Sequence, residues 1–172
     1  MSEKDQSISQ RFLCLFFVVA FAVLVSTPIY AEGYDNALNG VNGYDAIFDV
    51  AKGDPKIANI VFWAVKNAYE ISEVNALEKA PRIAVVFHGP AVKLISSDRN
   101  PFNAAEWVEV VKFQETLRKM KKDGVKLEVC LYAAEVMGVD KATIMPEIDQ
   151  VGNGFVSVIG YQMQGYALVS IP

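Results

Sequence analysis

The stretch that decides the fold is RIAVVFH, residues 82–88, which is followed by Gly89 and Pro90. Its apolar residues follow one another without the polar and apolar alternation of a half-exposed strand. Strands buried on both faces are typical of parallel sheets that helices cover. A further strand is predicted at VKLEVC, residues 125–130. The first stretch therefore predicts a central strand of an α/β domain.

Helical patterns alternate with the strands. Asp54 can accept hydrogen bonds from the first-turn amides of a helix, and Pro55 suits its first position. Asn103 and Glu106 have the spacing of a capping box, and Gly124 ends that second helix. We expect strands at 44–50, 82–88, 125–130, 155–159 and 166–171, helices at 55–72, 103–124 and 131–137, and a short helical segment at 143–149. Such alternation predicts the α/β class, with a mainly parallel sheet covered on both faces.

The N-terminus has the pattern of a signal peptide. Lys4 and Arg11 precede an apolar run of 14 residues, 12–25, which is shorter than a membrane-spanning helix requires. Cleavage after Ala31 is the expected outcome, and an uncleaved membrane anchor is the alternative. We therefore divide the chain into a signal peptide (1–31), a linker rich in Gly, Asn and Asp (32–42) and one domain (43–172), located in the periplasm or otherwise exported.

Composition excludes several classes of function. The formal net charge of −4 argues against nucleic-acid binding, which needs a clustered positive field. The sequence has no CxxC pair, no P-loop and no GxGxxG motif. One histidine and one mature cysteine are too few for a typical metal site, so we expect neither a metal nor a cofactor.

Two residues at predicted strand ends could carry chemistry. Cleavage would remove Cys14 and leave Cys130 as the single thiol of an exported chain, which suggests a reactive group or an intermolecular bond. Cys130 ends a strand and precedes a helix, whose amides can stabilise a thiolate. His88, the only histidine, could hold the thiol proton if it lies nearby. The alternatives are a buried, structural Cys130 and a His88 that bonds to the turn backbone.

The sequence also resembles a known family. The resemblance rests on the order of four stretches: Phe48–Lys56, Val86–Pro90, Gly124–Cys130 and Gly154–Tyr166. Together they are similar to the DsrE/DsrF-like sulfur-relay superfamily, especially its exported, poorly characterised branch. The resemblance implies a three-layer α/β/α domain with a five-stranded parallel sheet, assembled as a trimer or hexamer.

The resemblance also suggests a role for each candidate residue. Some members carry a persulfide on a cysteine at the position of Cys130, and His88 matches a recurrent strand-end histidine. The first hypothesis is a sulfur carrier or sulfurtransferase-like protein that works with sulfur donor and acceptor proteins. The second is a non-catalytic homo-oligomeric binding or accessory module in which Cys130 is structural.

Overall fold

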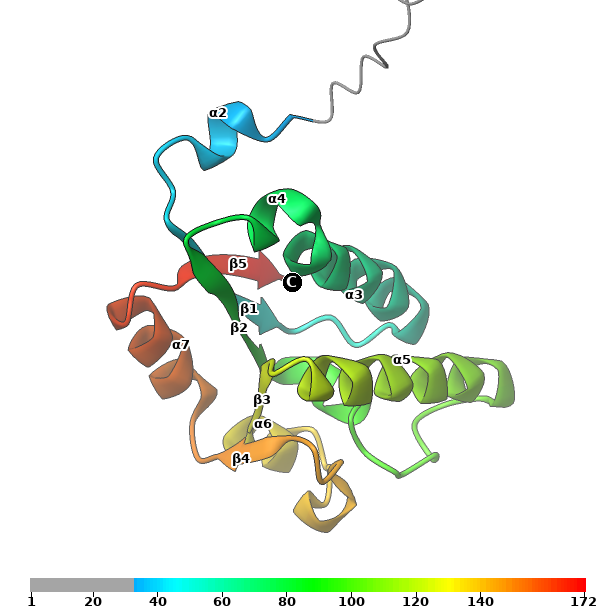
Figure 1. Cartoon of the computed structure of the whole chain (residues 1–172). Coiled ribbons are helices and arrows are strands. Elements are labelled where there is room, and N and C mark those ends of the chain that lie inside the picture. The colour runs from blue at the N-terminus through cyan, green and yellow to red at the C-terminus, as the bar shows by residue number, and fades with distance from the viewer. Residues whose placement is uncertain (1–32) are drawn as a thin grey trace, which may run out of the picture. The chain divides into compact units, whose positions relative to one another are not determined.

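A computed structural model describes residues 33–172 (Figure 1). The predicted signal peptide lies outside these residues. The described chain divides into a short N-terminal unit that ends at Asn39 and a second unit, Gly40–Pro172. The N-terminal unit contains one helical turn, α2 (Asp35–Leu38), within the segment expected to be a linker. Among residues 33–172, no helix is both long enough and apolar enough to cross a membrane.

The second unit alternates strands and helices along most of its length. Its strands are β1 (Gly43–Val50), β2 (Lys79–Phe87), β3 (Lys126–Cys130), β4 (Asp149–Val151) and β5 (Ala167–Ile171). Its α-helices are α3 (Pro55–Glu70), α4 (Ser72–Asn75), α5 (Ala104–Lys122), α6 (Leu131–Val136) and α7 (Gly154–Met163). Two 3-10 helices, η1 (Gly89–Lys93) and η2 (Lys141–Thr143), lie in the connections.

The five strands form one parallel sheet in the order β4-β3-β2-β1-β5. β2 lies at the centre, and its residues Ile83–Phe87 are all buried. This confirms the prediction from the apolar stretch at 82–88, since helices cover both faces of that strand. In a parallel sheet all carboxyl ends lie at one edge, which brings the ends of β1, β2 and β3 together.

Helices α3 and α5 cover one face of the sheet and α7 covers the other (Figure 1). The larger core contains Phe62 of α3, Phe87 of β2 and Phe113 of α5, with the Phe62 and Phe113 rings 4.8 Å apart in an edge-to-face arrangement. The smaller core, beneath α7, includes Val86, Val158 and Tyr161. The three-layer α/β/α fold is therefore confirmed.

Helix caps fix the starts of the two long helices as the sequence predicted. Asp54 accepts a hydrogen bond from the Ile57 amide at 2.8 Å. Asn103 accepts from the amides of Ala105 and Glu106, and the Glu106 carboxylate accepts from the Asn103 amide, which completes the capping box.

Two predicted elements are wrong. The expected strand at 155–159 belongs to α7, because Asn153 accepts a hydrogen bond from the Phe155 amide and starts a helix there. The expected helical segment at 143–149 is not a helix beyond Thr143, the last residue of η2: Ile144 forms a β-bridge with Ser96, residues 146–148 form a turn and bend, and Asp149 begins β4. The Met145 amide donates to the Ile95 backbone oxygen, and the Ile148 amide donates to the Met145 oxygen at 3.1 Å in the turn, so these bonds do not follow a helical pattern.

Candidate functional site

Cys130 lies where β3 ends and α6 begins. It is the N-cap residue of α6, and its Sγ accepts a hydrogen bond from the Ala133 amide at 3.4 Å. Its exposed fraction is 5%, so the side chain is held against the protein. The same amide can donate to the sulfur when it is ionised, and hydrogen bonds to ionised groups are stronger than those to neutral ones. The local structure therefore suits the thiol for nucleophilic chemistry.

Gly154 brings the start of α7 against this cysteine. A Cβ added at Gly154 would lie 2.9 Å from the Cys130 Cβ, 3.1 Å from Val86 Cγ1 and 3.6 Å from the Cys130 Sγ. No side chain fits in that space without movement of a neighbour. The absence of a side chain at position 154 thus sets how closely α7 approaches the sulfur.

His88 follows β2 directly and pairs with an acidic residue of β1. Its Nε2 lies 2.6 Å from Asp49 Oδ1, in an ion-pair contact whose angle departs from that of a well-aligned hydrogen bond. The backbone amide of His88 donates to the Val50 oxygen at 2.9 Å, which fixes the position of the residue beside β1. The Asp49 carboxylate therefore faces the imidazole and compensates its charge when the ring is protonated.

Asp49 is a residue that the sequence analysis did not single out. It follows Asp45 by four residues along β1, and an even spacing in a strand puts both carboxylates on one face of the sheet. Asp45 is paired with Arg82 on the neighbouring strand, which lowers the pKa of Asp45 through a side-chain hydrogen bond. Two carboxylates within an otherwise mainly apolar strand were the feature of the sequence that could have drawn attention to Asp49.

One cavity brings His88 and Cys130 together. Its volume is about 250 Å³, and it opens between the ends of β2 and β3 and the starts of α6 and α7. The sequence placed both residues at strand ends but could not place them side by side. The cavity is lined by His88, Gly89, Cys130, Tyr132, Ala133, Val136, Met137, Asn153, Gly154 and Phe155.

The walls of this cavity are mainly apolar. The Phe155 ring lies 6.1 Å from the His88 ring, centre to centre, and thus flanks the imidazole. Tyr132, Val136 and Phe155 are each more than half exposed, so they also form part of the outer surface around the opening. A thiol, an imidazole and apolar walls can support transfer of a small group to and from sulfur.

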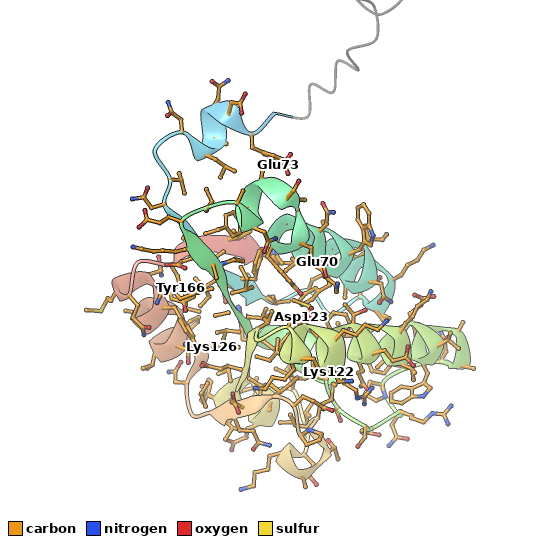
Figure 2. All side chains as sticks on the ribbon, in the orientation of Figure 1. Glu70, Glu73, Lys122, Asp123, Lys126 and Tyr166 are labelled. Carbon is orange, nitrogen blue, oxygen red and sulfur yellow. The ribbon has the colours of Figure 1, made fainter. Side chains whose placement is uncertain are left out.

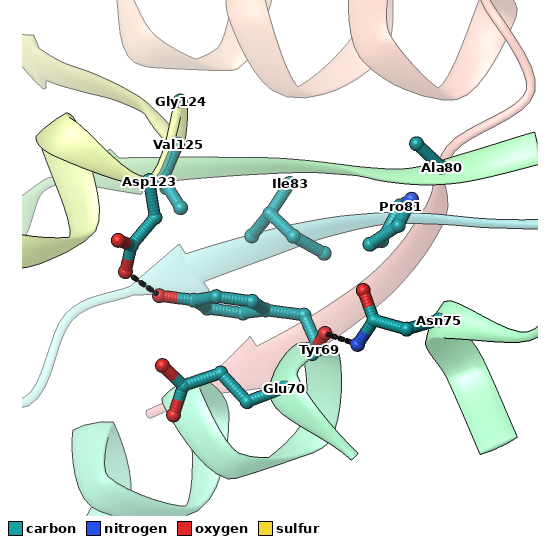
Figure 3. Close-up of a pocket in the computed structure, with 9 residues that line it drawn as sticks. All are labelled: Tyr69, Glu70, Asn75, Ala80, Pro81, Ile83, Asp123, Gly124 and Val125. Atoms are coloured by element: carbon teal, nitrogen blue, oxygen red, sulfur yellow. Dashed lines mark hydrogen bonds between the residues drawn. The ribbon is translucent and has the colours of Figure 1, made fainter. Parts of the chain in front are cut away.

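A larger cavity of about 610 Å³ lies at the amino ends of β2 and β3, the opposite edge of the sheet (Figure 3). There the Tyr69 hydroxyl donates to Asp123 Oδ2 at 3.0 Å. Burial raises the pKa of Tyr69 above its usual value, and the Asp123 acceptor raises it further. This cavity contains neither candidate residue; it is lined by Tyr69, Glu70, Asn75, Ala80, Pro81, Ile83, Asp123, Gly124 and Val125.

A polar network lies on the face of the sheet that α7 covers, where Figure 2 shows Lys126 and Tyr166. The Tyr161 hydroxyl donates to Glu128 Oε1 at 2.6 Å, and the Tyr161 and Tyr166 rings lie 5.0 Å apart. Burial raises the pKa of Tyr161, and its hydrogen bond to Glu128 adds to the effect. Both tyrosines pack in the smaller core.

Within residues 33–172, no group of three or more His, Cys, Asp or Glu side chains is arranged to hold a metal ion. The Cys130 cavity is therefore described by its thiol, its imidazole and its apolar walls.

The fold and the cavity define a three-layer α/β protein with a cysteine at the carboxyl edge of its parallel sheet. The DsrE/DsrF-like family model matches residues 45–171, and the chain belongs to that family. The family is generally related to sulfur relay. A search of curated protein sequences gave no match.

Solved structures of the same fold come from distant relatives. MTH1491 of Methanobacterium thermoautotrophicum, described as a protein of unknown function, is 19% identical with a TM-score of 0.56, over 74% of this chain and 98% of that one. BT1422 of Bacteroides thetaiotaomicron, also described as of unknown function, is 19% identical with a TM-score of 0.51, over 74% of this chain and 95% of that one. At this identity the likeness concerns the fold alone.

Proposed function

We propose that this protein is a sulfur carrier that holds sulfane sulfur as a persulfide on Cys130. The observation that carries the proposal is the shared cavity of Cys130 and His88 in a chain of the DsrE/DsrF-like family. Two further features support it. The Ala133 amide donates a hydrogen bond to Cys130 Sγ, and the cavity opens to the surface between Tyr132, Val136 and Phe155.

The carrier cycle consists of two exchange steps at sulfur. The Cys130 thiolate attacks the sulfane sulfur of a donor, a new S–S bond forms, and the donor's own S–S bond breaks with the electron pair leaving on the donor. His88 holds the thiol proton and returns it to the leaving group. An acceptor thiolate then attacks the outer sulfur of the persulfide, and Cys130 leaves as a thiolate.

Mass spectrometry tests the proposal directly. The full domain is incubated with inorganic polysulfide, and its peptides are then analysed for added sulfur. We expect the mass of one or more sulfur atoms on the peptide that contains Cys130, and none on a Cys130→Ser variant. Parallel treatment with a small alkylating reagent is the control. If the reagent modifies Cys130 but no sulfur is added, the carrier proposal is wrong.

A non-catalytic accessory module is the second candidate. It is favoured by the burial of Cys130 at 5% exposure and by its hydrogen bond as the cap of α6, since both are also expected of a structural cysteine. In that case Cys130→Ala would lower the free energy of unfolding, and the folded variant would bind its partner as tightly as the wild type does. A Cys130→Ala variant that retains its stability but takes up no sulfur would reject this candidate.

We also propose that the protein is a homo-oligomer. Apolar side chains on the outer surface of α7 support this: Phe155, Val156, Ile159 and Met163 are each more than half exposed. Apolar patches of this kind often mark interfaces. We expect Ile159→Asp to reduce the mass measured by light scattering after gel filtration. Val108→Asp, on the opposite face of the sheet and exposed to a similar extent, is the matched control. A wild-type protein with the mass of one chain would contradict the proposal.

Export is a proposal that rests on the N-terminal sequence. The charged residues, the apolar run and the cleavage site after Ala31 support removal of residues 1–31. The mass of the mature chain purified from its native cell envelope tests this. A chain that retains Cys14 in the membrane fraction would favour the uncleaved anchor instead.

A further inference from the structure

The cavity at Cys130 offers little to compensate a negative charge. Among the residues that the structure describes, no lysine or arginine lines it. The group there that can become cationic is His88, and Asp49 Oδ1 already lies 2.6 Å from its Nε2. A protonated His88 would therefore be compensated by a carboxylate before any ligand arrives.

Three backbone amides at the helix ends around the cavity are also already bonded. The Tyr132 amide donates to the Gly152 oxygen at 3.2 Å, and the Ala133 amide donates to Cys130 Sγ. At the start of α7, the Phe155 amide donates to Asn153 Oδ1 at 3.0 Å. Free amides at a helix start are what usually bind anions in proteins. These three amides are not free to replace the water around an anion.

An anion that enters this cavity would lose hydration without gaining a cation or these donors, and burial of an uncompensated charge is unfavourable. An apolar group would instead contact Val136, Met137 and Phe155 and leave water. We propose that the sulfur donor of this protein is a sulfane compound with an uncharged, apolar body, of the class R–S–SH with an aliphatic or aromatic R, which enters and reacts in its protonated, neutral form. The proposal rests on the carrier function and specifies its substrate.

The transfer step balances with no added oxidant or reductant. The Cys130 thiolate attacks the terminal sulfur of R–S–SH, and the bond between Cys130 Sγ and that sulfur forms. The S–S bond of the donor breaks, and its electron pair leaves on R–S⁻. The products are the Cys130 hydrodisulfide and R–S⁻, which takes the proton that His88 held. The transferred sulfur remains in the sulfane oxidation state throughout.

Competition among three donors tests the proposal on the full domain. Benzyl hydrodisulfide and glutathione hydrodisulfide share the reacting group but differ in the charge of the body, and thiosulfate is a small dianion. For each donor, the rate of sulfur addition to Cys130 is measured by mass spectrometry. This rate is divided by the rate at which the same donor transfers sulfur to free N-acetylcysteine, which corrects for the donor's intrinsic reactivity. Because burial of the aromatic ring stabilises the bound donor, we expect the normalised rate with the benzyl donor to exceed that with each of the other two donors by about tenfold or more.

Three outcomes are informative. If no donor adds sulfur to Cys130, the carrier function itself is wrong. If all three add it at equal normalised rates, or if thiosulfate is preferred, the carrier function stands and the substrate proposal is overturned. The preference for the benzyl donor supports it.

A charge placed at the opening provides a second test. Val136 lines the cavity and is 62% exposed, so Val136→Lys is compatible with folding. We expect this variant to lower the benzyl-to-thiosulfate ratio severalfold. Val108→Lys is the matched control, because Val108 is 61% exposed on α5, on the opposite face of the sheet. Equal ratios in wild type and Val136→Lys would show that the cavity does not select the donor.

Discussion

Gly154 allows the start of α7 to lie directly against Cys130, so a methyl group added at this position perturbs the candidate site. A Cβ at position 154 would lie 2.9 Å from Cys130 Cβ and 3.1 Å from Val86 Cγ1. Neither atom is the end of a long, flexible side chain. Both belong to sheet residues that are buried, so the start of α7 must move away from the sheet.

The size of the effect follows from a comparison within the same helix. Overpacking a well-packed core by a methyl group costs about 1–3 kcal/mol, and we expect this loss for Gly154→Ala. Gly160 lies in the interior of α7, and a Cβ there would meet nothing within 4 Å. Gly160→Ala should therefore gain about 0.5–1 kcal/mol, because glycine is unfavourable inside a helix.

Urea unfolding of the two variants and the wild type gives these free energies. Sulfur loading of Cys130 is measured in parallel under native conditions. We expect opposite shifts in the unfolding midpoint and a slower loading rate in Gly154→Ala alone. Equal stability gains in both variants would refute the close approach of α7 to Cys130.

Three other predictions concern the site and the helices around it. Asp49→Asn should slow sulfur loading by up to about fivefold, because a partly exposed ion pair contributes at most about 1 kcal/mol; an unchanged rate would show that Asp49 does not assist His88. Burial and the carboxylate acceptors raise the pKa of Tyr69 and Tyr161 above 10.0, so the folded state holds these protons more tightly than the unfolded chain. The unfolding free energy should be insensitive to these groups below pH 10.0 and fall as pH rises above it, and a Tyr69→Phe, Tyr161→Phe double variant should show a flatter fall; equal slopes would contradict this. Asn103→Ala removes the capping box of α5 and should lower the free energy of unfolding by about 1 kcal/mol, seen as a lower urea midpoint. Asn100→Ala, in the preceding loop, should lower the free energy of unfolding by less.

The central strands and the long helices were predictable because local signals and tertiary environment agree there. The apolar run at 82–88 needs burial on both faces, and the sheet provides it at β2. Asp54 and Asn103 cap the helices that their side chains favour. These residues specify the fold through interactions that extend only a few positions along the chain.

The sequence 155–159 shows where local reasoning fails. FVSVI has the apolar and β-branched residues of a strand, yet it lies in α7, where Val158 is buried against the sheet while Phe155, Val156 and Ile159 are exposed. A helix is recognised in a sequence when apolar residues lie on one face and polar residues on the other. In α7 the exposed face is also apolar, so the sequence shows no helical periodicity there. The Asn153 cap decided the outcome.

The candidate site was predictable residue by residue but not as an arrangement. Cys130 and His88 could be placed at strand ends, and the strand order β3-β2 then makes them neighbours at one edge. Sequence alone does not give the strand order, so it could not give their shared cavity. Asp49 was missed for the same reason, since β1 lies beside β2 only in the folded sheet.

The measurement that tests the central claim most directly is the mass of Cys130 after exposure to a sulfane donor. The account predicts that the native wild-type domain gains sulfur on Cys130, that a reducing thiol removes it, and that Cys130→Ser gains none. A native domain whose Cys130 is alkylated by a small reagent but never gains sulfur, with any of the three donors, would contradict the account.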